Sequence, residues 1–308
     1  MGSRQPVAVI ALLATACSLT TSLEGLYGGN HSAEPGISSI SDAGGADTSA
    51  PDTGAVDASS DAFPNDGTAP DREAAAPDSQ PDTPTGSAYR AAVMADQPLA
   101  YWRLHETTGQ VAIDEMGNAS PGTFSGTAGR GVPGAVGDGD TATSFDGTTT
   151  RLDIGDSFAF PGTAAFSIEV WVMVSVIDTQ VRRIVSRNVQ TGPDDGYALY
   201  YGDTFVLFSR FTAGTENGYA GGPTLPAGRF AHLVATYDGG ATNLYIDGAV
   251  VDTGGTTSPI SSGPGTLAFG DGARDAFFKF QGALDEIAVY GNALSAARVL
   301  AHYHASGR

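Results

Sequence analysis

The chain has 308 residues, with 42 glycines, 17 prolines and a formal net charge of -19. Such an acidic surface repels phosphate backbones and anionic lipid headgroups, which excludes nucleic-acid binding and membrane attachment through a basic patch. The length allows one large all-β domain or two domains of ordinary size.

The N-terminal residues 1–17 have the pattern of a signal peptide. They contain one cation, Arg4, followed by the apolar run from Val7 to Ala16. At about 1.5 Å per residue this run is too short to span a bilayer, and it has the length of a signal-peptide core. It ends in Leu13-Ala14-Thr15-Ala16, directly before the single cysteine, Cys17. We therefore expect an exported protein.

The residues around Cys17 resemble the lipobox of bacterial lipoproteins. By that resemblance Cys17 is the lipidated mature N-terminus and the only attachment to a membrane, and Ser18 after it favours the outer membrane or cell surface. The family usually has Leu three residues before the cysteine, where this chain has Ala14. The alternative is an ordinary secretory signal, with Cys17 left as a free thiol. A single cysteine allows no intrachain disulfide in either case.

Residues 18–87 form an acidic linker in this interpretation. From about Gly28 onward Ala, Asp, Pro, Ser, Thr and Gly dominate, without an apolar period of either kind, and Arg72 is the only basic residue between His31 and Ala88. Such a segment cannot bury enough apolar surface to offset the cost of ordering its backbone. We expect a disordered spacer with a root-mean-square reach of about 40–50 Å. The alternative is a linker constrained only by solubility.

A folded domain is predicted from residue 88 to residue 308, because aromatic residues and apolar alternation return at Tyr89 and at residues 99–104. Turn signals recur about every ten residues, and one convincing helix is expected near Ser295 to Ala305, which suits an antiparallel sandwich. The expected strands are residues 143–145, 151–154, 166–174, 183–187, 197–201, 205–211, 229–237, 242–246, 267–270 and 277–290.

The closing stretch, Phe280 to Ser295, is predicted to form a core strand, a turn and the start of the last helix, around which the rest of the domain is organised. Small or acidic residues alternate with apolar ones from Ala283 to Tyr290, which is typical of a strand with one buried face. A turn through Gly291-Asn292 follows, and Ser295 is the expected N-cap of the last helix.

Six motifs in order carry a family resemblance, and they cover essentially all of Ala88 to His304. They are AYWRLHETTG, VAIDEMGN, GDTATSFDG, FSIEVWVM, FAHLVATYDGGATNLYIDG and FQGALDEIAVYGNALSAARVLAHY. Together they resemble a laminin-G-like, concanavalin-A-like lectin/glucanase domain of the bacterial type. The resemblance implies a jelly roll of two antiparallel sheets, often with one calcium ion, in proteins that bind glycans or other proteins at surfaces. Phe230, where the family commonly has Trp, and His105 depart from it.

A structural Ca²⁺ site is expected because this cation takes six to eight oxygen ligands, which loops between strands can supply. Glu106, Asp114 and Asn118 lie in a loop near the start of the domain, and Asp285 lies on the final strand, which in this fold pairs beside the first. A buried carboxylate is costly unless a cation or several donors meet it. Backbone N–H groups or Arg103 could hold Asp285 instead, or it could point outward.

A carboxylate pair for glycoside hydrolysis is not found, so we expect no catalytic residues. Glu169 has no acidic partner at the next inward positions of its strand, and strict alternation would direct Asp285 and Glu286 to opposite sides. Nucleophile and zinc-protease motifs are also missing from the sequence. His232 is expected to be a structural residue.

Exposed aromatic rings are candidates for sugar contacts, because sugar faces stack on them. Alternation directs Tyr197 and Tyr201 to the core and leaves Tyr200 and Tyr219 as the candidates at a surface. The sequence thus predicts a non-catalytic extracellular binding or adhesion module for carbohydrate or a surface protein. The alternatives are a carbohydrate-active enzyme or its accessory domain, and a structural lipoprotein of the cell envelope.

Overall fold

The computed structural model describes residues 85–308, apart from residues 119, 190–193, 261–262 and 272–278. The predicted signal peptide, Cys17 and the linker up to residue 84 lie outside the described residues. None of the described helices has the length and apolar character needed to cross a membrane.

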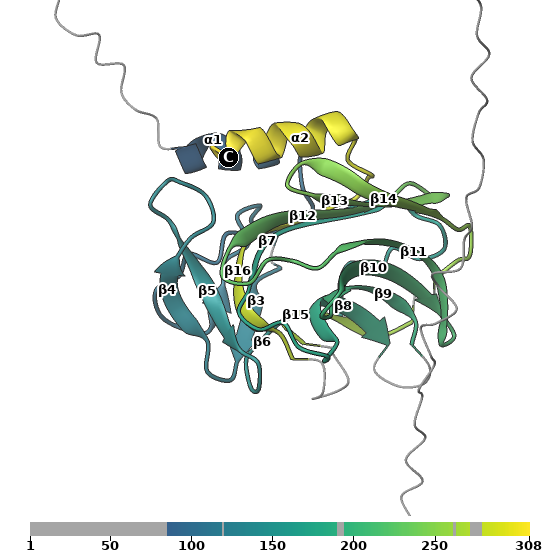
Figure 1. Cartoon of the computed structure of the whole chain (residues 1–308), viewed down its shortest axis with the longest axis horizontal. Coiled ribbons are helices and arrows are strands. Elements are labelled where there is room, and N and C mark those ends of the chain that lie inside the picture. The colour runs from purple at the N-terminus through teal and green to yellow at the C-terminus, as the bar shows by residue number, and fades with distance from the viewer. Residues whose placement is uncertain (1–84, 119, 190–193, 261–262, 272–278) are drawn as a thin grey trace, which may run out of the picture. The chain divides into compact units, whose positions relative to one another are not determined.

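Two antiparallel sheets form a sandwich, as predicted (Figure 1). Sheet A contains, in spatial order, β14 (Ala249–Gly255), β13 (Ala241–Ile246), β12 (Phe230–Tyr237), β7 (Phe166–Val174), β16 (Gln281–Tyr290), β5 (Thr141–Asp146) and β4 (Gly129–Pro133). The first strand, β1 (Ala100–Trp102), pairs with β16 as expected. Sheet B contains β11 (Thr215–Pro223), β10 (Phe205–Thr212), β9 (Gly196–Tyr201), β8 (Arg182–Val189), β15 (Gly265–Phe269), β6 (Arg151–Gly155), β3 (Gly122–Ser125) and β2 (Val111–Ala112).

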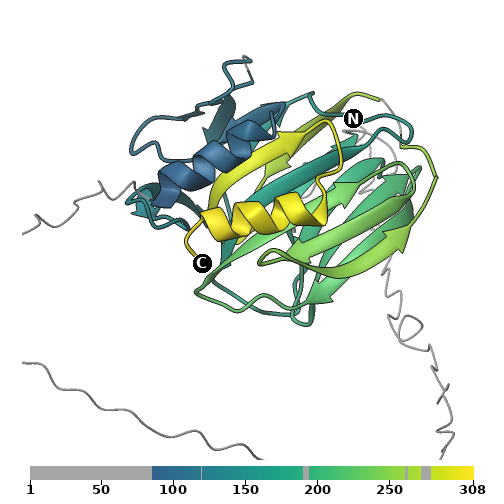
Figure 2. The same ribbon diagram turned by 90° about the horizontal axis from the view of Figure 1, so that it is seen from above.

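Two helices, α1 (Thr85–Ala95) and α2 (Ala296–Ala305), lie side by side over the outer face of sheet A (Figures 1 and 2). Helix α2 is the predicted C-terminal helix, and the backbone N–H of Arg298 donates to the N-cap Ser295 Oγ at 3.3 Å. Helix α1 was not predicted and crosses the proposed domain start at residue 88. Its start is compositionally part of the linker, but its buried pair Tyr89 and Val93 has the i, i+4 spacing of a helix face.

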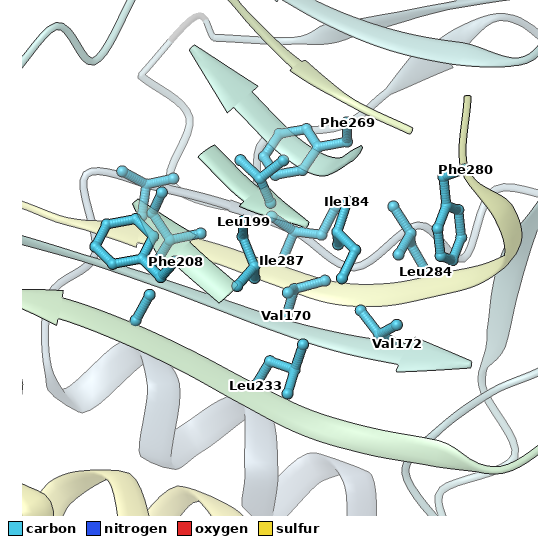
Figure 3. Packing of buried hydrophobic residues seen from close by; sticks show 14 of the residues in the cluster. Val170, Val172, Ile184, Leu199, Phe208, Leu233, Phe269, Phe280, Leu284 and Ile287 are labelled. Carbon is cyan, nitrogen blue, oxygen red and sulfur yellow. The ribbon is translucent and has the colours of Figure 1, made fainter. Parts of the chain in front are cut away.

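The core lies between the sheets, and on β7 it follows strict strand alternation. On β7 the side chains of residues 166, 168, 170, 172 and 174 point into the sandwich, and Figure 3 shows Val170 and Val172 packed with Leu199, Leu233 and Ile287. Trp171, on the other face of β7, belongs to a second cluster with residues of α1 and α2. Strand β7 is therefore buried on both faces, which the sequence alone did not reveal.

The strands that sequence analysis missed are short, glycine-rich or exposed. Strands β2, β3 and β4 have two to five residues. The edge strands β11 (TENGYAGGP) and β14 (AVVDTGG) carry glycines and mostly exposed side chains. They form because a neighbouring strand offers hydrogen bonds, whereas their own propensity for strand formation is weak.

We predict that Leu233→Ala lowers the free energy of unfolding by about 2–5 kcal/mol, because this fully buried side chain leaves a cavity between the sheets. Urea unfolding measures the loss. Val251→Ala is the matched control: Val251 is 38% exposed on β14 and its truncation should cost less than about 0.5 kcal/mol. Equal losses for the two variants would contradict this placement of the core.

Candidate functional site

A β-bulge in β16 brings two adjacent carboxylates to one place. Pairing with β7 shifts register between Asp285 and Ala288, and Glu286 takes a φ of 50°, in the left-handed region that non-glycine residues rarely adopt. Asp285 is 1% and Glu286 0% exposed. The expectation that they face opposite sides is therefore wrong, because the extra bulge residue breaks the alternation that it assumed.

Arg103 is the cation beside these carboxylates. Its Nε lies 3.2 Å from Glu286 Oε1, its Nη2 lies 2.8 Å from Asp138 Oδ2, and it also contacts Asp140. The Tyr101 hydroxyl donates to Glu286. Burial raises the pKa of Glu286 to about 7, although Arg103 and Tyr101 oppose that rise. Burial and the neighbouring Glu286 also raise the pKa of Asp285 well above its usual value.

These groups border an open depression of about 320 Å³, which we call the acidic pocket. It is lined by Arg103, His105, Asp138, Gly139 and Asp140. Oxygens of Asp138, Asp140 and Glu286 lie within 4.8 Å of one another. Such carboxylate oxygens suit a hard cation, but the guanidinium of Arg103 already forms ion pairs with all three carboxylates.

The four predicted calcium ligands do not gather at one point. Glu106 Oε1 accepts the N–H of Ile113 at 2.7 Å, and Asn118 Nδ2 donates to the Leu99 carbonyl at 3.0 Å. Asp114 Oδ1 accepts the backbone N–H groups of Tyr101 and Met116 at 3.1 and 3.0 Å.

Asp285 Oδ2 accepts the N–H of Ala135 at 2.8 Å, which is the backbone alternative that the sequence left open. Among the described acidic, histidine and cysteine residues, the set whose ligand atoms converge is Asp138, Asp140 and Glu286. Asp114 Oδ2 and Asp285 Oδ1 are buried without a hydrogen-bond partner, so each keeps an oxygen that a cation could use. Calcium binding stays a prediction.

The two predicted ligand-binding tyrosines lie on one surface, the face of sheet B that points away from sheet A. Tyr200 on β9 pairs with Leu207 of β10, and Tyr219 on β11 pairs with Ser209 of β10. Phe208, between those two β10 residues, points into the core, so alternation places both tyrosines outside. We call this surface the outer face of sheet B.

Tyr200 is held in a polar and aromatic setting on that face. Its hydroxyl lies 3.0 Å from both Ser209 Oγ and Glu216 Oε1, and the guanidinium of Arg183 lies 4.5 Å from its ring centroid. The same guanidinium lies 5.7 Å from the ring of Phe211. Burial and the nearby Glu216 raise the pKa of Tyr200 above its usual value. Tyr219 is 39% exposed.

Sequence reasoning missed the importance of Glu169. This residue lies on the outer face of β7, fully buried, and accepts hydrogen bonds from side chains that include His232. His232 is thus buried and hydrogen-bonded, as expected for a structural residue. The signal in the sequence was the acidic Glu169 within the apolar run of β7, because a central strand rarely buries a charge without partners.

A family model described as the concanavalin A-like lectin/glucanases superfamily (Laminin_G_3) matches residues 146–300. The chain belongs to this superfamily. The match runs through the two central strands β7 and β16 of the laminin-G-like domain and confirms the resemblance in the sequence motifs. No match was found among curated proteins.

Solved structures share the fold of this laminin-G-like domain. Domain 4 of AbnA, an extracellular arabinanase of Geobacillus stearothermophilus in complex with arabinotriose, is 21% identical, with a TM-score of 0.53; the match covers 67% of this chain and 97% of that one. Trypanosoma rangeli sialidase in complex with sialic acid is 14% identical, with a TM-score of 0.51 and coverage of 66% and 32%.

The receptor-binding domain of botulinum neurotoxin C/D mosaic serotype is 10% identical, with a TM-score of 0.53 and coverage of 68% and 51%. The match covers about a third of the sialidase chain, about half of the neurotoxin receptor-binding domain and nearly all of the arabinanase domain. At these identities the likeness establishes the fold.

We predict that Arg103→Gln lowers the free energy of unfolding by about 3–5 kcal/mol, because it leaves Glu286 buried without its cation. Arg90→Gln is the matched control. Its ion pair with Glu115 involves an arginine side chain that is 41% exposed, and its removal should cost less than about 1 kcal/mol. Urea unfolding at neutral pH compares the two, and a loss for Arg103→Gln as small as that of the control would contradict the assignment.

The calcium prediction is tested by thermal unfolding in chelator and in added Ca²⁺. Binding should stabilise the chain by about 2.7 kcal/mol at a hundredfold excess over the dissociation constant. Asp138→Asn should abolish that gain if the acidic pocket holds the ion, whereas Asp114→Asn should abolish it if the predicted loop does. A melting temperature unaffected by both chelator and calcium would reject the site in either place.

Proposed function

We propose that this laminin-G-like domain is a non-catalytic module that binds carbohydrate outside the cell through the outer face of sheet B. One observation carries the proposal. Helices α1 and α2 cover the outer face of sheet A, whereas sheet B presents Tyr200, Phe211 and Tyr219 on a face with no helix among the described residues (Figure 1).

The chemistry of this face suits a sugar. Pyranose and furanose rings pack on aromatic faces, while charged and hydroxyl groups at the edge bind their hydroxyls. Arg183, Ser209 and Glu216 surround the ring of Tyr200 and supply such polar groups. The arabinotriose complex of the arabinanase domain and the sialic acid complex of the sialidase support carbohydrate as the ligand class.

The proposal places the domain on an exported protein, attached to the cell envelope through a lipid on Cys17. The support comes from the apolar N-terminal run and the small residues before Cys17. A surface protein as the ligand and an enzymatic role stay as alternatives. Release of reducing ends from a bound glycan by the full chain would favour the enzyme.

We predict that Tyr200→Ala weakens glycan binding at least tenfold, about 1.4 kcal/mol, because the stacking surface on sheet B is lost. A glycan array with the full chain, including arabinotriose and sialic acid, selects the ligand, and calorimetry measures its affinity. Tyr200→Phe keeps the ring but loses the hydroxyl contacts with Ser209 and Glu216, so its effect should be smaller. Tyr219→Ala should also weaken binding.

Leu300→Ala is the matched control, because Leu300 is 42% exposed on α2, on the other side of the sandwich. It should bind like the unsubstituted chain. A Tyr200→Ala variant that remains folded and binds with unchanged affinity would contradict the proposed face. An array without any bound glycan would favour a protein ligand or a structural role instead.

A further inference from the structure

Glu169 is the meeting point of four elements besides its own strand. Its carboxylate is fully buried and accepts from Tyr89 of α1 at 2.8 Å, from His232 Nε2 of β12 at 2.7 Å and from Tyr290 of β16 at 2.6 Å. The fourth donor is His302 Nδ1 of α2, 3.0 Å from Oε2. We call these five residues the Glu169 cluster.

The cluster favours an ionised Glu169. Two tyrosine hydroxyls and two histidine rings meet both oxygens of the carboxylate, and such a set of donors matches a carboxylate that only accepts. Burial alone would raise the pKa of Glu169, but the charge of His302 and the hydrogen bonds from both histidines outweigh burial and hold that pKa well below its usual value. Glu169 is therefore a buried charge.

His302 faces a second carboxylate with its other ring nitrogen. Nε2 lies 3.0 Å from Oδ2 of Asp96, the residue that follows α1, and Arg298 Nε lies 2.8 Å from the same oxygen. The ring hydrogen-bonds Glu169 through Nδ1 and places Nε2 at ion-pair distance from Asp96. Nε2 makes no hydrogen bond to Asp96 in this geometry, so this contact is an ion pair, and a fully buried ring with a carboxylate on each side is stabilised in its doubly protonated, cationic form.

We propose that His302 is a pH-sensitive latch, whose charged ring bridges Glu169 under the sheet and Asp96 beside α1 and so fixes both helices to sheet A. When the ring loses a proton, the ion pairs with Glu169 and Asp96 lose their shared cation. Because Tyr89 and Asp96 belong to the α1 segment and His302 to α2, the loss loosens both helices together.

Every element around the ring contributes to this balance. The titratable or charged groups beside it are Glu169 of β7, Tyr290 of β16, Tyr89 of α1 and Asp96 after α1; Arg298 of α2 pairs with the same Asp96 oxygen, and His232 of β12 shares the Glu169 carboxylate. Burial lowers the pKa of His302 and so does Arg298, but Glu169 and Asp96 outweigh them and raise it. Tyr89 and Tyr290 stay protonated near neutral pH, because burial raises the pKa of both.

The directions of the pKa shifts of His302 and Glu169 determine the pH range in which the latch is closed. A raised pKa of His302 gives stabilisation that is complete below its unfolded value of about 6.5 and is lost as pH rises through the folded value. A lowered pKa of Glu169 gives stabilisation that is present above its unfolded value of about 4.3 and is lost as pH falls through the folded value. The helices are held best in mildly acidic solution and loosen in alkaline solution.

Two local measurements on the full chain test the latch. Amide hydrogen exchange of residues 296–305, corrected for the intrinsic rate, should rise at least tenfold between about pH 6 and pH 9. The ¹⁵N resonances of the His302 ring should report two protonated nitrogens at neutral pH. Local readouts are needed because Glu286, with its pKa raised to about 7, also titrates and would contribute to global unfolding.

Substitutions assign the effect to one ring. His302→Gln should remove the pH dependence of exchange in α2, whereas His304→Gln, in an exposed position on the same helix, should keep it. A His302→Gln chain with the pH dependence of the unsubstituted protein would overturn the proposal. So would a singly protonated His302 ring at neutral pH, a measurement that decides the matter even if His302→Gln does not fold.

Discussion

The structure depends on a buried charge, the carboxylate of Glu169. A carboxylate in the middle of a central strand is tolerated only where donors surround it, and here they come from α1, β12, β16 and α2. The outer face of sheet A is consequently sealed by two helices around a polar centre. No helix among the described residues covers sheet B, and its outer face carries Tyr200 and Tyr219.

Much of the fold was predictable because its signals are local. Apolar alternation fixed β7 at Phe166–Val174, and the turn and serine after β16 located α2 with Ser295 as its N-cap. The first and last strands pair as the family resemblance implied. Edge strands such as β11 and β14 escaped prediction because their glycines and exposed residues carry no period, and only the neighbouring strand makes them extended.

The candidate sites were less predictable, because they depend on contacts between distant residues. The bulge at Asp285 and Glu286 turns two side chains to one side, which no period-two rule anticipates. Asp138 and Asp140 join Glu286 across more than a hundred residues, and the sequence gives no sign of that meeting. Glu169 was visible as a polar residue in an apolar run, but its partners depend partly on α1, whose start looks like the linker.

The position of α1 determines which face of the domain lies opposite the point where the chain enters it. The chain enters the sandwich through α1, on the side of sheet A, and sheet B lies on the opposite side (Figures 1 and 2). The point where the chain enters the domain and the face that carries Tyr200 and Tyr219 thus lie on opposite sides of the sandwich. The entry segment of the domain and a ligand on the outer face of sheet B therefore do not compete for the same surface.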